Sequence, residues 1–153
     1  MKYLFIVLYL VSSHAFSINL KLIGACSDKP IYELDIQLKG FISLGEFTVR
    51  TFEQNSIPYI GNEIALNSIL NFPTGLDALE VIDNHTMRAH GACYMVDGVI
   101  PEIFPANLVL GLENQSITWF IGYSTFIDGA WIGQCDFTSN IAPEQFCSNK
   151  NNL

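Results

Sequence analysis

The sequence predicts an α+β domain made of several short strands and one main helix. Runs in which apolar and polar residues alternate recur along the chain, as is typical of strands with one buried face. Turn pairs such as Asp97-Gly98 and Asp128-Gly129 separate some of these runs. Only one segment, residues 74–82, is predicted to form a helix. A two-layer domain is therefore expected, with the helix packed on one face of the sheet.

Two strands are expected in the first half of the chain. Residues 31–38 (IYELDIQL) alternate and end at a Lys-Gly pair. Residues 46–52 (EFTVRTF) also alternate, with Phe47 and Val49 on one face. A turn at residues 59–62 and a short returning strand at 63–66 follow.

The main helix is expected over residues 74–82 (TGLDALEVI), where Leu76 and Leu79 recur at helical spacing. Thr74 is a suitable N-cap, and Asp77 three residues later resembles a capping box with Asp in place of Glu. Early carboxylates also suit the positive end of the helix dipole. These signals together predict that the helix begins at Thr74 and ends near Ile82.

The second half of the chain is predicted to be mostly strand. Strands are expected at residues 92–96, 109–110 and 116–122, and Trp131-Ile132 forms a final apolar patch. The turn between the first two of these strands places Gly98 at a positive φ, a conformation that glycine adopts cheaply. Two early strands, one helix and then further strands describe a β-grasp-like two-layer domain with a mixed sheet.

Several short motifs match a known family. Residues 96–98 (Val-Asp-Gly) match a Val-Asn-Gly turn, and residues 106–110 match an Ala-Asn loop followed by Leu. Residues 112–119 match a Leu, turn and Ile-Thr-Trp strand entry, with Glu-Asn-Gln in place of the family's Asp-Gly-Asp turn. Residues 74–80 match the family's Thr-x-Leu-Asp-Ala-Leu-Glu helix. Over about residues 47–123 the chain therefore resembles the C-terminal β-domain of transcobalamin and the transcobalamin-like domains of secreted proteins.

The first 17 residues are predicted to be a signal peptide. Lys2 precedes an apolar core and small residues, with cleavage expected after Ala15 or Ser17. The apolar core is too short to span a membrane, so the protein is expected to be secreted and extracellular. The rest divides into an N-terminal arm with one strand (18–46), the transcobalamin-like β-grasp domain (47–135) and a Cys-containing tail (136–153).

The four cysteines, Cys26, Cys93, Cys135 and Cys147, predict two disulfides, because an even number in a secreted chain favours pairing. Three pairings are possible, and the sequence does not choose among them. The smallest loop-closure cost favours Cys135 with Cys147, which leaves Cys26 with Cys93.

Two glycosylation sequons begin at Asn84 and Asn114, both in predicted turns. The formal net charge of −8 with only seven Lys and Arg argues against nucleic acid as a partner, because phosphate binding needs clustered basic residues. The same charge disfavours anionic membranes.

No catalytic motif is present, and the protein is predicted not to be an enzyme. After signal removal only His85 and His90 remain, and an enzyme would need one of them beside a buried nucleophile. Asp83, both histidines and Cys93 form the densest polar cluster. Their spacing fits no standard zinc site, so no metal is predicted.

Aromatic residues are the best candidates for a binding site. Alternation places Trp119 and Phe120 on opposite faces, and the helix can cover only one of them. The other face either presents apolar surface to a ligand or lies under the N-terminal strands or the tail. The predicted ligand-binding residues are Tyr94, Trp119, Tyr123 and Trp131.

These features predict a secreted non-enzymatic binding module for a small ligand on one face of the β-grasp. The alternative is a module or effector that binds an extracellular protein or carbohydrate and no small ligand. The resemblance implies cobalamin as a ligand. However, transcobalamin closes over it with a helical domain that this chain lacks, so the isolated chain is expected to bind cobalamin weakly or not at all.

Overall fold

The computed structural model describes residues 16–38, 40–111, 113 and 116–148. The predicted signal peptide up to residue 15, the sequon at Asn114 and the end of the chain from residue 149 lie outside these residues.

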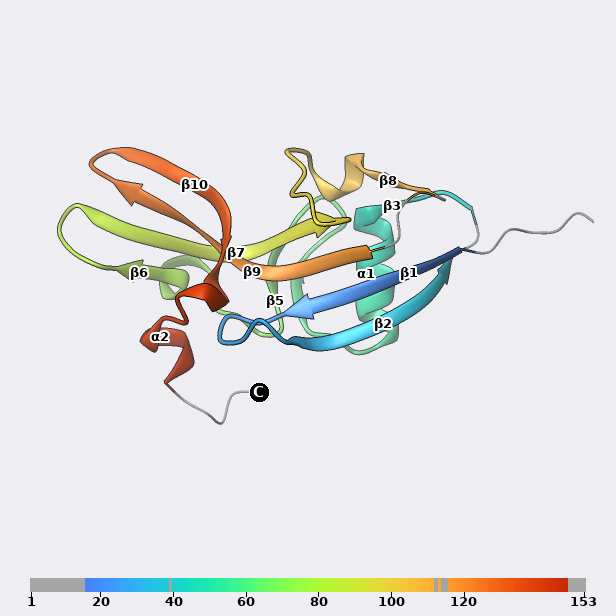
Figure 1. The fold of residues 1–153 in the computed structure, drawn as a ribbon, viewed down its shortest axis with the longest axis horizontal. Coiled ribbons are helices and arrows are strands. Elements are labelled where there is room, and N and C mark those ends of the chain that lie inside the picture. The colour runs from blue at the N-terminus through green and yellow to red at the C-terminus, as the bar shows by residue number, and fades with distance from the viewer. Residues whose placement is uncertain (1–15, 39, 112, 114–115, 149–153) are drawn as a thin grey trace, which may run out of the picture.

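A curled mixed sheet forms the main layer of the α+β fold. Its strands lie in the order β2 (Pro30–Leu38), β1 (Phe16–Ile23), β9 (Ser116–Ile127), β7 (Thr86–Val96) and β6 (Leu79–Val81). β1 runs parallel to the first half of β9, and β10 (Ala130–Phe137) pairs antiparallel with the second half. The β6, β7, β9 and β10 end of the sheet therefore extends away from the helix (Figure 1).

Shorter elements complete the fold. β3 (Ile42–Ser43) pairs with β8 (Val109–Leu110), and β4 (Tyr59–Gly61) pairs with β5 (Leu66–Ile69). The α-helices are α1 (Leu44–Gln54) and α2 (Glu144–Cys147). Three 3₁₀ turns are η1 (Gly75–Ala78), η2 (Pro105–Asn107) and η3 (Thr138–Asn140).

The strand predicted at residues 46–52 is wrong, because this segment belongs to helix α1. Ser43 is the N-cap, and its hydroxyl accepts a hydrogen bond of 3.1 Å from the Glu46 N–H. The buried side chains include Leu44, Phe47 and Phe52, which recur at helical spacing. Over only seven residues, the alternation of Phe47 and Val49 fits a strand as well as the buried residues fit a helix. The N-cap at Ser43 is the local signal that favours the helix.

The main helix predicted at residues 74–82 is also wrong. The segment forms the single turn η1 and then strand β6, which pairs with β7. Gly75 has a φ of 63°, and the Thr74 side chain makes no capping hydrogen bond. Because the second half of the segment pairs with β7, the local helix signals are overridden by tertiary structure.

The core lies between α1 and the sheet. Alternate residues of β1, namely Ile18, Leu20 and Leu22, are fully buried. Leu44 and Phe52 of α1 are also fully buried, as expected for a helix with one apolar face packed on a sheet. This N-terminal region holds two long strands, β1 and β2, instead of the one expected, and β1 lies inside the sheet.

Both predicted turn pairs are present. Asp97 and Gly98 have φ values of 50° and 81°, so the expected positive φ at Gly98 is confirmed. Asp128 and Gly129 have φ values of 47° and 91° and join β9 to β10. Positive φ at both central residues is the geometry of a tight two-residue hairpin.

Two disulfides are formed, but the predicted pairing is wrong. Cys26 pairs with Cys147, and Cys93 pairs with Cys135. The minimum-loop argument fails because the fold places the chain after β1 beside the C-terminal segment, a non-local contact that loop length does not predict. Both bonds suit an extracellular protein. Within the described residues, no helix has the length and apolar character needed to cross a bilayer.

Candidate ligand-binding site

Trp119 and Tyr94 lie side by side on neighbouring strands, on the face that α1 covers. Their ring centroids are 5.2 Å apart, and the Trp119 Nε1–H donates to the Thr48 hydroxyl at 3.0 Å. Trp119 is 1% exposed and Tyr94 is 8% exposed. The helix therefore fixes the Trp119 ring, and the Trp119 ring in turn supports Tyr94.

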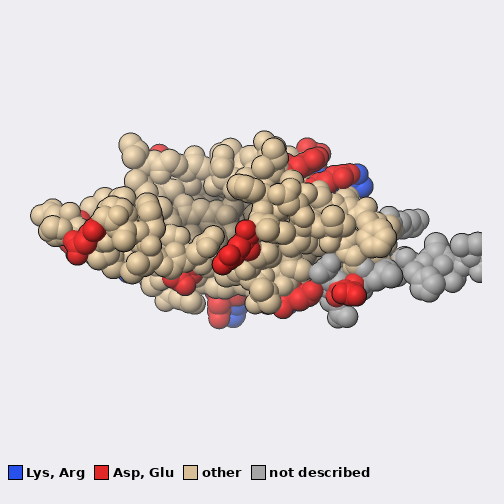
Figure 2. All heavy atoms as spheres, turned by 90° about the horizontal axis from the view of Figure 1, so that it is seen from above, with Lys and Arg blue, Asp and Glu red and all other residues tan. Residues whose placement is uncertain are grey.

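A hollow of about 340 Å³ lies beside these rings. We call it the edge hollow because it lies along one edge of β7. Its lining consists mainly of apolar residues from the start of β5, from β7, β9 and β10, and from the loop that leads into η2. The lining residues are Ala65, Leu66, Ala92, Cys93, Tyr94, Ile100, Pro101, Glu102, Ile103, Phe104, Pro105, Trp119, Gln134 and Cys135. Seen from above, the surface is hollowed near its middle (Figure 2).

The loop over the edge hollow is held at one point by a hydrogen bond. The Tyr94 hydroxyl donates to the Ile103 carbonyl at 2.5 Å. Ile103 and Phe104 remain 49% and 60% exposed, although both are large and apolar. An apolar group in the edge hollow would therefore remove further apolar surface from water.

The electrostatics of the edge hollow are simple. Glu102 is the only charged side chain among the lining residues. Burial raises the pKa of the Tyr94 hydroxyl, which therefore stays protonated and acts as a donor at neutral pH. The face seen from above carries scattered acidic groups and little basic surface (Figure 2). These features favour a neutral or basic ligand with an apolar group.

The other two predicted ligand residues lie elsewhere. Tyr123 packs against His90 with ring centroids 5.5 Å apart, and the Arg88 guanidinium lies 5.3 Å from its ring centroid. Trp131 is 53% exposed on β10 and packs edge-on against Phe126 at 5.3 Å. The structure thus brings together Tyr94 and Trp119 and separates them from Tyr123 and Trp131.

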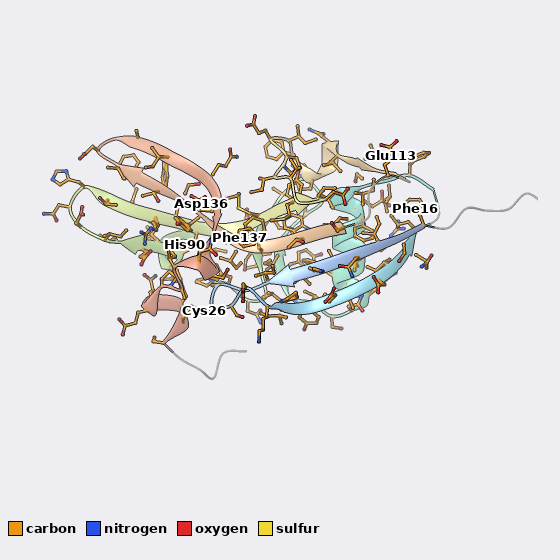
Figure 3. The ribbon with its side chains drawn as sticks, in the orientation of Figure 1. Phe16, Cys26, His90, Glu113, Asp136 and Phe137 are labelled. Carbon is orange, nitrogen blue, oxygen red and sulfur yellow. A yellow bond between two sulfur atoms is a disulfide. The ribbon has the colours of Figure 1, made fainter. Side chains whose placement is uncertain are left out.

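The face opposite α1 is covered near Phe120. The Phe120 ring stacks on Phe137 of β10 with centroids 4.0 Å apart, and Phe120 is fully buried. Figure 3 shows Phe137 at the end of β10, where the chain passes in front of the sheet. Trp119 and Phe120 do lie on opposite faces, but the tail side of the chain covers the second face at Phe120.

His90 lies in a buried polar cluster with a hydroxyl on one side and a carboxylate on the other. Its Nδ1 is 2.9 Å from the Thr138 Oγ1, and its Nε2 is 3.4 Å from a Glu80 carboxylate oxygen. Burial lowers the pKa of His90, although Glu80 acts in the opposite direction. In Figure 3 His90 lies on the sheet beside α2.

The order hydroxyl, imidazole and carboxylate is that of a nucleophilic triad. However, Thr138 is fully buried and lies on η3, directly after β10. A substrate would have to displace η3 and the packed ring of Phe146 to reach this hydroxyl. In the described geometry the cluster therefore joins η3 and β6 to β7.

The polar cluster at residues 83–93 is not brought together. Cys93 is in a disulfide, and His90 is buried. His85 lies at an exposed turn, where its Nδ1 is 3.2 Å from an Asp128 carboxylate oxygen. The part of the chain that the structure describes contains no group of three or more possible metal ligands. Asn84 is exposed in the turn between β6 and β7.

Sequence reasoning missed the loop that forms one wall of the edge hollow. Residues 99–105 (Val-Ile-Pro-Glu-Ile-Phe-Pro) contain four large apolar residues and one charge. Connecting loops that cross the surface are usually more polar than this, so the composition was a usable signal of a contact surface. Comparison with protein-family models, curated proteins and solved structures finds no match to this chain.

Proposed function

We propose that this chain is an extracellular, non-enzymatic binding module that takes an apolar group of its ligand into the edge hollow. The observation that carries the proposal is the position of Tyr94 and Trp119 as a rigid wall facing the exposed Ile103 and Phe104. Ligand sites commonly combine such apolar walls with few polar groups. Here the polar groups are the Tyr94 hydroxyl and Glu102.

The β-grasp and transcobalamin-like assignment remains part of this proposal. It rests on the sequence motifs around the Asp97-Gly98 turn and Trp119, while the segment matched to the family's helix, residues 74–80, forms η1 and the start of β6. Cobalamin itself is a poor fit, because a hollow of about 340 Å³ is near the lower limit for ligand pockets. A corrinoid would leave most of its surface in water.

We further propose a secreted glycoprotein. The two disulfides and the exposed Asn84 favour this route. Strand β1 begins at Phe16, so cleavage after Ala15 would leave the whole strand, whereas cleavage after Ser17 would remove its first two residues. The first site is therefore favoured.

The test is a fluorescence titration with Nile red, a neutral apolar probe, using the Trp131→Phe variant. Trp119, which lines the edge hollow, is then the only tryptophan, so energy transfer from it reports dye binding, and the variants below locate the bound dye. We expect saturable transfer in this background. Cobalamin should give no saturation in the micromolar range.

Phe104→Ser should weaken dye binding several-fold, because it removes one apolar wall. Phe41→Ser is the matched control, since Phe41 is 78% exposed and does not line the edge hollow. Equal binding by wild type, Phe104→Ser and Phe41→Ser would contradict the proposed site.

A further inference from the structure

Strand β7 is much longer than the strand that covers its outer edge. β7 pairs with β9 along all eleven residues without a shift in register. On its other side, β6 pairs only with Met87, Arg88 and Ala89. Figure 1 shows β6 beside only the outer end of β7. Beyond Ala89 no strand pairs with this edge among the described residues, and Ala92, Cys93 and Tyr94 of β7 line the edge hollow.

Two hydrogen bonds show which residues of β7 face this outer side. The Ile82 N–H donates to the Thr86 carbonyl at 3.0 Å, and the Val96 N–H donates to the Val99 carbonyl at 2.9 Å. In an antiparallel strand, the N–H and C=O of one residue point to the same side, and successive residues alternate. Ala92 and Tyr94 lie an even number of positions away from Thr86 and Val96. Their backbone N–H and C=O groups therefore also point away from β9, toward the outer side.

The described residues offer no backbone partner to Ala92 or Tyr94 on this side. The reason lies in the hairpin that follows β7. Val96 and Val99 exchange two hydrogen bonds, so the next pair would be Tyr94 with residue 101. Residue 101 is proline, which has no N–H to donate. The returning chain therefore leaves the sheet, and the edge stays open.

Open space lies along the same residues. The edge hollow is lined by Ala92, Cys93 and Tyr94. A second hollow of about 540 Å³ is lined by residues 89–92 and by η1. The two hollows share Leu66 and Ala92 in their linings, so Leu66 at the start of β5, which packs against β7, lies at the boundary between them. On its outer edge β7 thus pairs with β6 at residues 87–89 and with Val99 at Val96, and the stretch between these two pairings has no strand partner among the described residues.

We infer that this gap binds an extended polypeptide segment of a partner protein, which adds to the sheet as a short strand opposite residues 91–95. The proposal rests on the proposed function and names its ligand. Backbone donors and acceptors repeated every second residue are matched by another extended backbone. A lipid or a corrinoid offers no such repeat.

Side-chain chemistry further defines the peptide. Alternate side chains of an added strand point to opposite faces, so one set faces the apolar wall of Trp119, Ile103 and Phe104. Glu102 is the one charge in this lining. The preferred segment therefore carries an aromatic or aliphatic residue in the edge hollow, with neutral or basic flanking residues.

The experiment is a selection of random capped heptapeptides on the wild-type protein, with Ala92→Pro as the counter-target. Proline at this position removes an outward N–H and spares the β7–β9 ladder, and Gly91 before it has no Cβ to clash. Ala92→Ser keeps the N–H and is the matched control. Selected peptides should bind wild type and Ala92→Ser at least tenfold more tightly than Ala92→Pro.

Hydrogen exchange provides a readout that needs no variant. In the free protein the amides of Ala92 and Tyr94 should exchange faster than those of Gly91 and Cys93, which face β9. A bound peptide should protect Ala92 and Tyr94. N-methylation of the peptide residues whose N–H groups face β7 should abolish binding, and N-methylation of the alternate residues, whose N–H groups face away, should not.

Three results would overturn the inference: no sequence enriched over Ala92→Pro, equal binding to both proteins, or no protection of the Ala92 and Tyr94 amides. If Nile red binding still depends on Phe104, the proposed function survives that failure. If peptides protect both amides but bind Phe104→Ser as tightly as wild type, the strand addition stands and the edge hollow is not its pocket.

Discussion

Cys93 of β7 and Gly122 of β9 are diagonal neighbours on adjacent strands, and the Cys93 sulfur leaves no room for a side chain at position 122. A Cβ atom at residue 122 would lie 2.7 Å from the Cys93 Sγ and 3.1 Å from the Cys135 Cα. The disulfide between Cys93 and Cys135 therefore crosses β9 over a glycine. This close approach explains why a small residue interrupts an otherwise bulky strand.

Gly122→Ala should lower the free energy of unfolding by about 1–3 kcal/mol, as is typical of overpacking at a site that cannot relax. Urea denaturation followed by circular dichroism measures this. Gly91 is the residue paired with Gly122, and nothing lies within 4 Å of its Cβ position. Gly91→Ala should therefore be near neutral, and an equal loss in both variants would contradict the role of the disulfide.

Thr48→Val should destabilise the protein by about 1–3 kcal/mol, because it leaves the buried Trp119 N–H without an acceptor while keeping the side-chain shape. Thr51→Val on the same helix is the control, since Thr51 is buried but its hydroxyl makes no hydrogen bond with the described residues. Equal stability of the two variants in thermal unfolding would show that the hydrogen bond contributes little.

Sequence patterns predicted the α+β class, the two Asp-Gly turns and most strands in the second half, because these depend on local chemistry, whereas the turn predicted at residues 59–62 is strand β4. Asp97-Gly98 and the residues after Ser116 illustrate this. The helix was misplaced, since residues 46–52 fit both a period of two and a helical period. The Ser43 to Glu46 capping spacing was the local signal that could have identified α1.

The candidate site was only half predictable, for a different reason. Tyr94 and Trp119 were identified from the alternation of their strands, but their contact depends on the register between β7 and β9. The cysteine pairing depends on the parallel placement of β1 beside β9, a non-local contact. The open edge of β7 follows from Pro101 only when the hairpin register is known.

Substitutions at Gly98 should be ranked by their tolerance of positive φ. The residue has a φ of 81°, and nothing lies within 4 Å of its Cβ position, so the cost is backbone strain alone. Gly98→Asn should cost least, Gly98→Ala about 1–2 kcal/mol, and Gly98→Val most. Chemical denaturation measures the series, and a stability order that follows side-chain size instead would contradict it.

Digestion without reduction should release peptides that link residue 26 to 147 and 93 to 135. No free thiol should react before reduction. The chain-entropy model assigns about 5 kcal/mol to the bond that spans 121 residues and about 4 kcal/mol to the one that spans 42. Replacing Cys26 and Cys147 together by Ser should therefore destabilise at least as much as replacing Cys93 and Cys135. Peptides that link 135 to 147 would contradict the structure.

Acid should weaken the fold through His90. Burial lowers its pKa from the ordinary value of 6.5. Below that value the unfolded chain binds a proton that the folded protein does not, so the free energy of unfolding falls as pH decreases. Above it both states hold a neutral imidazole, and the contribution disappears.

The groups facing His90 set the window for this measurement. They are Glu80, Arg88, Tyr123 and the Thr138 hydroxyl. Carboxylates take up protons mainly below about pH 5, so urea unfolding between pH 5.5 and 7.5 isolates the imidazole. His90→Gln should flatten the decline in this range and lower stability at pH 7.5. His85→Gln, which removes an exposed imidazole, should retain the decline. A wild-type pH profile in His90→Gln would show that another group causes the loss.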